Sequence, residues 1–352
     1  MTRWILVAGL ILGCGGAISD RAAPPARSLN GWDPLPQLEK SRIAGGTFAG
    51  GYLVAPAGYL NWYFANLGLS GFVDRVPAEV KQYLNLYIAH LEPGWNIQDV
   101  TFDDPYHPET STWEKKAQDS DDSYAATFLS LAARYVRVTG DTAWFNANLA
   151  TLKNIAYYNL AVPQNANGLV RVFQAHSSND VYYTEDNCED YKGLMDFSAE
   201  LSAVGDPDAS YYAAVAGPIA TAVGNLMYLP NDGAFAVVWN GAVNPLSASP
   251  GYYPRGVTQA FPQGYQLPVA QSEEDAAWSY LNAQFPSFWN GQYDADPFTI
   301  TGYTAALRGD TSIATAAQQR VQDMVAAGQA VPINDLSFYT RIDQVLAGGA
   351  PF

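Results

Sequence analysis

Hydrophobic and polar positions follow a helical period along most of the chain. Ten stretches place apolar residues at steps of three and four, the spacing that puts them on one face of an α-helix. Three short runs are strand-like instead, at Ile97 to Phe102, Leu169 to Phe173 and Phe235 to Trp239. The pattern predicts an all-α fold with small β-hairpins in its loops. The ten predicted helices are Gly58 to Leu69, Ala78 to Leu91, Asp122 to Val138, Ala143 to Leu160, Glu189 to Val204, Ala209 to Met227, Glu274 to Phe285, Phe298 to Leu307, Ser312 to Ala327 and Leu336 to Leu346.

The connections between these helices are of two kinds. Three are tight turns in which a glycine ends one helix and an aspartate is placed to cap the next, namely Thr139-Gly140-Asp141, Val204-Gly205-Asp206 and Arg308-Gly309-Asp310. The others are long and aromatic, at residues 91–118, 162–188 and 228–272. Long loops in a compact domain are usually functional. We therefore expect an all-α closed toroid of five or six antiparallel hairpins, with the first helix of each pair inside and the long loops at one working face.

Composition and charge remove several classes of function. The 352 residues include 34 acidic and 18 basic side chains, for a net charge of −16. This balance argues against nucleic-acid binding and against membrane docking through basic residues. Two cysteines and three histidines disfavour a disulfide framework or a structural zinc site. We predict no cofactor and no metal, because the acidic run at residues 119–122 lacks the glycine turn and distal glutamate of a calcium-binding hand.

The amino terminus has the pattern of an export signal. Arg3 precedes an apolar run from Ile5 to Leu12, which is too short to span a bilayer. The sequence Ile11-Leu12-Gly13-Cys14 resembles a bacterial lipobox, so residues 1–13 are predicted to be removed and Cys14 to be lipidated; an ordinary secretory signal is the alternative. We expect a flexible tether over residues 14–45 and a single folded domain over residues 46–352. We also expect an exported monomer, anchored as a lipoprotein at the periplasmic or cell surface. Cys188 is then expected to be a buried thiol.

Acidic clusters mark three of the predicted helix starts. Within them Asp119 and Asp122, Asp186 and Glu189, and Ser272 and Asp275 are each three residues apart. A capping box explains this spacing without any catalytic role. If the hairpins are antiparallel neighbours, however, these starts converge at one end of the toroid.

Glycoside hydrolysis is usually catalysed by two carboxyl groups that lie close together, so converging carboxyl groups favour this reaction. Crowding raises the pKa of at least one of them, which separates a protonated acid from an ionised base. Our first catalytic pair is Asp122 and Glu189, with Asp275 in reserve and neither residue assigned as acid or base. Asp119 and Asp186 either cap their helices or hold substrate hydroxyls or the attacking water.

Aromatic residues near these clusters are candidates for sugar binding, since pyranose C–H faces stack on indole and phenol rings. The alternative is that such rings pin the long loops to the end of the barrel. His176 lies on a polar loop, where it could bind sugar, organise the loop, or act with Tyr182 in a lyase. The candidate substrate-binding residues are Asp119, Tyr124, Trp113, His176, Tyr182, Asp186, Tyr191 and Trp239.

Two segments carry a resemblance to a known superfamily. Residues 119–129, continuing through Tyr135 and the Gly140-Asp141 turn to Trp144, resemble the inner-helix, turn and outer-helix unit of the six-hairpin glycosidases. Residues 186–194 are similar to a second such unit. The resemblance covers residues 50–348 in layout and 119–205 in motif, and it implies an (α/α)6 toroid and a carbohydrate substrate. Catalytic positions differ between families of this superfamily, so it assigns no residue a role.

These observations together predict a glycoside hydrolase acting on an oligo- or polysaccharide through two carboxyl groups. A carbohydrate-binding surface lipoprotein that has lost the catalytic pair is the alternative. A polysaccharide lyase is less favoured, because Arg171 and Arg255 are the only nearby basic residues in the loops. The last predicted helix has no visible outer partner, so the toroid is either incomplete or closed by the N-terminal segment.

Overall fold

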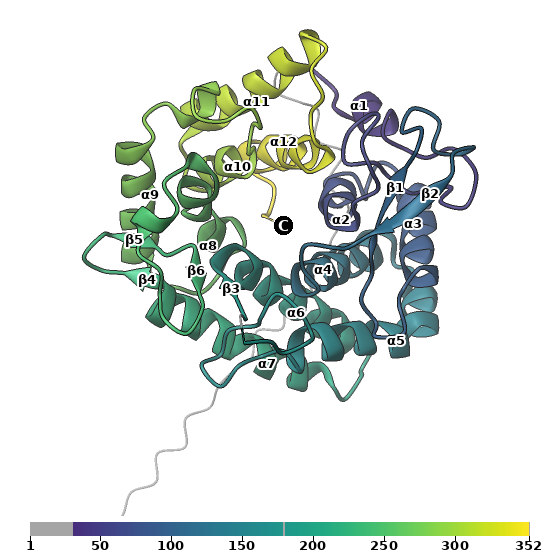
Figure 1. The fold of residues 1–352 in the computed structure, drawn as a ribbon, viewed down its shortest axis with the longest axis horizontal. Helices are drawn as coiled ribbons and strands as arrows, with labels where there is room; N and C mark the ends of the chain where they lie inside the picture. Colours follow the sequence, from purple (N-terminus) through teal and green to yellow (C-terminus); the bar gives the residue numbers. More distant parts are fainter. Residues whose placement is uncertain (1–30, 179, 352) are drawn as a thin grey trace, which may run out of the picture.

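The computed structural model describes residues 31–178 and 180–351, and these form a two-layered ring of helices (Figure 1). The predicted signal segment and Cys14 lie outside the described residues. Six helices form the inner ring, and each contacts the next until the last meets the first. The toroid predicted from the helical period is therefore confirmed. The inner helices are α2 (Trp62–Ser70), α4 (Asp122–Thr139), α6 (Thr184–Ala203), α8 (Phe261–Gly264), α10 (Ile300–Leu307) and α12 (Ile333–Leu346).

Six more helices surround this ring. Each outer helix follows its inner partner in sequence, apart from α1, which packs against α12 at the opposite end of the chain. The N-terminal segment thus supplies the outer partner that the last hairpin lacked in the sequence. The outer helices are α3 (Pro77–Ala89), α5 (Thr142–Ala156), α7 (Ala209–Ala222), α9 (Gln271–Gln284), α11 (Thr311–Ala326) and α1 (Leu35–Glu39).

The position of α1 corrects the tether predicted over residues 14–45. Leu38 is 0% exposed and Ile43 is 1% exposed, and both belong to the hydrophobic core. The described part of that range is consequently packed into the domain. The physical reason is that α12 presents an apolar face which would otherwise meet water.

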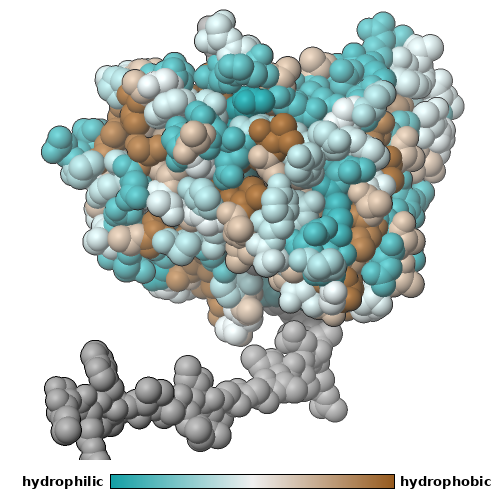
Figure 2. All heavy atoms as spheres, turned by 90° about the horizontal axis from the view of Figure 1, so that it is seen from below, coloured by the Kyte–Doolittle hydropathy of each residue, from teal (hydrophilic) through white to brown (hydrophobic). Residues whose placement is uncertain are grey.

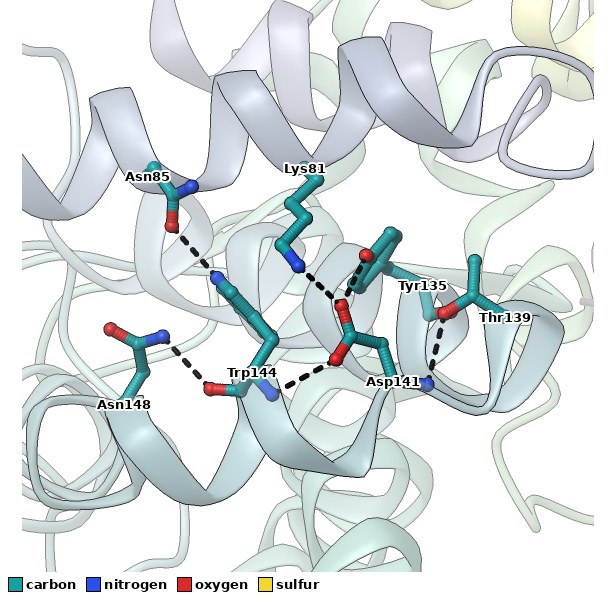
Figure 3. A network of polar contacts seen from close by, with 7 residues as sticks. All are labelled: Lys81, Asn85, Tyr135, Thr139, Asp141, Trp144 and Asn148. Carbon is teal, nitrogen blue, oxygen red and sulfur yellow. Dashed lines mark hydrogen bonds and ion pairs between the residues drawn. The ribbon is translucent and has the colours of Figure 1, made fainter.

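The Gly-Asp turn between α4 and α5 shows how the hairpins are locked together (Figure 3). Gly140 has φ 72°, a left-handed conformation that favours glycine, and it ends α4. Asp141 Oδ1 accepts the Trp144 backbone N–H at 3.0 Å and so caps α5. Its Oδ2 accepts the Lys81 ammonium at 2.6 Å and the Tyr135 hydroxyl at 2.8 Å. One aspartate therefore joins α3, α4 and α5.

The other two Gly-Asp turns differ in detail. Gly205 and Gly309 are also left-handed, with φ of 75° and 76°. Asp310 caps α11 through the Ile313 N–H at 3.3 Å, as predicted. Asp206 does not cap α7, because its carboxylate binds Lys153 and the backbone N–H of Asp208.

Two neighbouring inner helices approach each other unusually closely. Gly193 of α6 faces Ala126 of α4, and a Cβ at this glycine would overlap the Ala126 backbone. The absence of a side chain at residue 193 lets α4 and α6 pack at short range. This contact sets the relative position of the two helices that carry the predicted carboxylates.

Short strands and turns decorate the loops. The strand pairs are β1 (Asp99–Phe102) with β2 (Trp113–Lys116), β3 (Tyr182–Tyr183) with β6 (Val238–Trp239), and β4 (Tyr228–Leu229) with β5 (Ala234–Phe235), all antiparallel. The predicted strand at residues 169–173 is wrong, since Val170 makes only an isolated bridge to Gln164. Short 3₁₀ and π turns are η1 (Tyr157–Ala161), η2 (Val223–Met227), η3 (Leu246–Ala248), η4 (Tyr252–Gly256) and η5 (Phe288–Asn290).

The side of the ring seen in Figure 2 carries hydrophobic residues in patches separated by hydrophilic and intermediate ones. Within residues 31–178 and 180–351, no helix combines the length and apolar character needed to cross a bilayer. Cys188 is buried in α6, as expected of an apolar thiol.

The sequence missed one inner helix, and this error matters for the site. Helix α8 has four residues and follows the π turn η4, so it falls inside the predicted loop at residues 228–272. Without α8, the next helix, α9, is counted as an inner helix when it belongs to the outer ring.

Candidate active site

A cavity of about 270 Å³ lies where the inner helices begin, and we call it the mouth cavity. Five of the six inner helices contribute to its wall, with Tyr63 from α2, Glu185 from α6, Phe261 from α8, Ile300 from α10 and Asp335 from α12. Because the long loops join these same helix ends, the cavity is at the face on which the sequence predicted the working site.

Two adjacent carboxyl groups of α6 are held at this face with raised pKa values. Burial raises the pKa of Glu185 to about 8, and the Thr258 hydroxyl donates to its Oε1 at 2.8 Å. Burial and then the charge of Asp119 raise the pKa of Asp186 to about 7. Both groups therefore hold protons in a range where an exposed carboxyl group is ionised.

The starts of α4 and α6 converge beside the mouth cavity, next to Tyr253 of its wall, although Asp119 and Asp186 are not among the residues that line it. Asp119 is exposed just before α4, and its charge acts on Asp186 of α6 and on Tyr253 of the cavity wall. The charge of Asp186 also acts on Tyr253. The two carboxyl groups and the tyrosine thus share one neighbourhood, as the converging helix starts predicted for the first two acidic clusters.

Glu189 lies one helical turn deeper than Glu185 on the same face of α6. Its Oε1 accepts the hydroxyls of Tyr63 at 2.8 Å and Tyr265 at 2.7 Å, and both rings line the mouth cavity. Its Oε2 is buried without a hydrogen-bond partner among the described residues. Burial raises its pKa well above the usual range. The structure therefore corrects the choice of Glu189 as a group in contact with substrate: it lies beneath the floor and holds two of its tyrosines.

Asp122 is buried even more completely. It is 0% exposed, its Oδ1 accepts the Ser123 N–H at 2.8 Å, and its Oδ2 has no partner in the described part of the chain. Burial and the charge of the buried Asp190 raise its pKa well above the usual range. The prediction that Asp122 looks into the cleft is wrong, because Asp122 is the buried first residue of α4, whereas Asp119 lies before the helix and stays exposed.

Asp275 does not join the cluster. Its side chain is 54% exposed and accepts Arg308 Nη2 at 2.5 Å on the outer helix α9. The prediction fails because the short helix α8 was not recognised, so that α9 was taken for the inner helix of its hairpin. The third acidic cluster is accordingly a surface feature.

Several predicted sugar-binding aromatics pin loops instead. Tyr124 is buried and donates its hydroxyl to Asp99 Oδ2 at 3.0 Å. Tyr182 is buried and packs edge-on against Trp239 at 5.1 Å between ring centroids, which joins β3 to β6. Trp113 packs edge-on against Phe48 at 5.0 Å. These contacts match the alternative weighed for the loop aromatics.

Tyr191 is half-buried and does not line the mouth cavity, and burial raises its pKa.

The groups considered for a lyase are occupied elsewhere. His176 is exposed and pairs with Asp180 on its own loop. The Arg171 guanidinium donates to the carbonyls of Phe173 at 2.9 Å and Gln174 at 2.6 Å. Neither residue lines the mouth cavity. Among the described residues, no group of three or more His, Cys, Asp or Glu side chains is placed to hold a metal ion.

Sequence reasoning missed several residues of the cavity wall. Glu185 was recognisable, since it stands four residues before Glu189 and so shares its helix face. Asp335 had no such signal, because it comes from the last hairpin. Its Oδ1 accepts the Thr299 N–H at 2.6 Å, and burial raises its pKa to about 6. Tyr253 and Phe298 stack at 5.0 Å between centroids, a pairing that only the folded chain creates.

The sequence matches no protein-family model and no curated protein. Solved structures do share its fold. A glycosidase variant matches with a TM-score of 0.64 and 12% identity, over 90% of this chain and 96% of that one. A rhamnosidase from Klebsiella oxytoca with rhamnose bound matches with a TM-score of 0.62 and 12% identity, over 91% of this chain and 65% of that one. An unsaturated glucuronyl hydrolase specific for heparin matches with a TM-score of 0.58 and 12% identity, over 90% and 95%.

These matches define the class of fold. The chain has the architecture of the six-hairpin glycosidases, as the resemblance in residues 119–205 implied. At 12% identity the likeness concerns the fold, and the chemistry has to be argued from the residues of the mouth cavity.

Proposed function

We propose that this protein is a glycoside hydrolase whose reaction takes place at the mouth cavity. The observation that carries the proposal is the pairing of Asp186, whose pKa burial raises to about 7, with the exposed Asp119 at the converging starts of α6 and α4. A carboxyl group that holds its proton, beside a second carboxyl group open to solvent, is an arrangement suited to glycosidic bond cleavage.

The two residues then have different roles. Asp186 is protonated below about pH 7 and donates a proton to the leaving glycosidic oxygen. Asp119 is open to solvent and acts on the anomeric carbon side, as a base for water or as a nucleophile. Glu185 accepts sugar hydroxyls from its position on the cavity wall, and the tyrosines above Glu189 provide a floor for the sugar ring.

Solved structures with the same fold support a carbohydrate substrate in general. They include a glycosidase, a rhamnosidase and an unsaturated glucuronyl hydrolase. Export as a lipoprotein anchored at Cys14 remains a proposal from the sequence, and it would place the enzyme where extracellular or periplasmic glycans are met.

The test is sugar release from a panel of oligo- and polysaccharides by the wild-type chain and two variants. Asp186→Asn and Asp119→Asn should each lower the turnover rate by roughly 10²–10⁴-fold while glycan binding persists. Asp275→Asn is the matched control, because it makes the same chemical change on the outer ring. If the wild-type chain binds glycans but releases no sugar from any of them, the carbohydrate-binding alternative is correct.

A further inference from the structure

The mouth cavity has a strongly one-sided electrostatic character. Four carboxyl side chains line it, Glu185 from α6, Asp294 and Asp296 from the loop before α10, and Asp335 from α12. No lysine, arginine or histidine is among the described residues of its lining. An approaching sugar therefore meets hydrogen-bonding carboxyl groups from three separate elements, and those that have lost their protons add negative charge.

The cations closest to the lining are held behind it. Arg341 stands 4.9 Å from the centre of the Phe338 ring. Arg320 of α11 donates Nη2 to the backbone carbonyls of Asp294 at 2.7 Å and Ala295 at 2.9 Å, and it lines an outer groove that Asp294 and Asp296 also line. Its charge partly offsets the rise in the pKa of Asp335. The guanidinium thus holds the loop from behind and is not placed to pair with a ligand in the cavity.

The rest of the wall is aromatic. Tyr253 and Phe298 stack in parallel, and Tyr63, Tyr265 and Phe338 complete the apolar surface. Such rings favour the C–H face of a pyranose. The wall therefore combines stacking surfaces, which any sugar can use, with carboxyl groups, which discriminate by charge.

We infer that the mouth cavity selects sugars by charge, excluding uronates and preferring a protonated amino sugar to its N-acetylated counterpart. The inference rests on the proposed function and names its substrate class. A uronate would bring a further carboxylate against a lining that contains no cation, where the charge of Arg320 already acts on Asp296 and Asp335, and this is costly in a partly buried cavity. An ammonium group would make charge-assisted hydrogen bonds to carboxylates of the wall.

The raised pKa values at Glu185 and Asp335 are consistent with this preference. Burial is the leading cause in both cases, and no cation pairs directly with either side chain among the contacts described. A bound ammonium would favour the ionised form of each carboxyl group, whereas a bound carboxylate would meet either repulsion or a neutral acid.

The test compares three oligosaccharides of equal length, made of glucosamine, N-acetylglucosamine or glucuronate. Binding to the wild-type chain is measured by titration calorimetry near neutral pH, above the pKa of about 6 of Asp335, and the products are analysed in the same samples. We expect the glucosamine oligomer to bind about 3- to 10-fold more tightly than the N-acetylated one, from one screened unit-charge interaction. The preference should shrink as the salt is raised from about 0.05 M to about 0.5 M.

Two variants show where the preference arises. Asp296→Asn removes one charge from the cavity wall, and it should cut the preference for glucosamine by roughly 3-fold, because the affinity for the charged oligomer falls more than the affinity for the N-acetylated one. Asp323→Asn is the matched control, because Asp323 lies on α11 in the outer groove and not in the mouth cavity. Equal loss in both variants would overturn the assignment to this cavity.

Other outcomes separate this inference from the proposed function. Tight binding or cleavage of the glucuronate oligomer, with sugar release that depends on Asp186, would overturn the charge selection and leave the hydrolase intact. Equal affinity for the glucosamine and N-acetylglucosamine oligomers would do the same. Failure of the chain to bind or cleave any carbohydrate would overturn both.

Discussion

Glu189 offers the sharpest test of how the site is built. Replacing it by glutamine should leave the stability of the protein nearly unchanged, whereas replacing it by alanine should lower the stability strongly. Its Oε1 accepts two tyrosine hydroxyls from the cavity floor, while its Oε2 makes no hydrogen bond among the described residues. Since burial keeps the acid protonated, glutamine is close to an isostere: its carbonyl accepts both hydroxyls, and its amide takes the place of the O–H.

The expected magnitudes follow from these contacts. Glu189→Ala leaves the buried Tyr265 hydroxyl and the partly buried Tyr63 hydroxyl without their acceptor and opens a cavity. The combined loss in unfolding free energy is about 2–5 kcal/mol. Glu189→Gln should change the unfolding free energy by less than about 1 kcal/mol at acidic pH, because no described hydrogen bond is lost. A small cavity of about 40 Å³ beside Glu189 leaves room for the amide.

The difference in stability between Glu189→Gln and the wild type should also depend on pH, and it should change in favour of the variant as the pH rises. The pKa of Glu189 in the folded chain is raised above the value of 4.5 for an unperturbed glutamate. Its stabilising contribution is complete below that value and declines as the pH rises towards the folded pKa. Glu189→Gln does not titrate, so it should gain on the wild type by at most about 1.4 kcal/mol per pH unit over this window.

Urea denaturation followed by circular dichroism at several pH values measures these differences, and sugar release is assayed in parallel. The expected result for Glu189→Gln is near-normal turnover and improved relative stability at higher pH. A fall in turnover of more than about 100-fold in a fully folded Glu189→Gln variant would show that this residue takes part in proton transfer. That result would refute the claim that Glu189 only supports the cavity floor and takes no part in the reaction.

Further outcomes test the remaining elements. Sugar release should fall as the pH rises above about 7, when Asp186 loses its proton, and a flat profile up to alkaline pH would exclude Asp186 as the acid. Gly193→Ala should lower the unfolding free energy by about 1–3 kcal/mol or more, measured by urea denaturation, because the new Cβ overlaps the Ala126 backbone; Gly217→Ala, where a Cβ meets open space, is its control. Tyr253→Ala should raise the KM for oligosaccharides more than it lowers turnover, and an unchanged KM would remove the stacking role assigned to this ring.

Much of the architecture could be read from the sequence because it depends on local interactions. A helix shows itself through the spacing of apolar residues, and a tight hairpin shows itself through glycine followed by aspartate. The turn at Gly140 and Asp141 formed as these rules predict. The toroid followed from their repetition, together with the contrast between short turns at one end and long loops at the other.

The error at Asp275 shows a limit of prediction from local sequence patterns. Helix α8 has only four residues and follows a π turn, so it lacks the length at which a period can be recognised. Once it was missed, α9 was assigned to the inner ring. The acidic cluster at its start then seemed to face the cavity, whereas Asp275 accepts hydrogen bonds from Gln271 and Arg308 at the surface.

What the sequence determined by itself is the helical period, the hairpin turns and the presence of acid at the starts of α4 and α6. Only the tertiary structure decided which of those acids reach a cavity, because residues one turn apart on a helix, such as Glu185 and Glu189, share a face and differ only in depth. It also brought Asp335 from the far end of the chain to the same wall. How deeply each carboxyl group is buried, and which groups meet at one wall, depend on the packing of six helices around one axis. The spacing of residues along a single helix does not determine either.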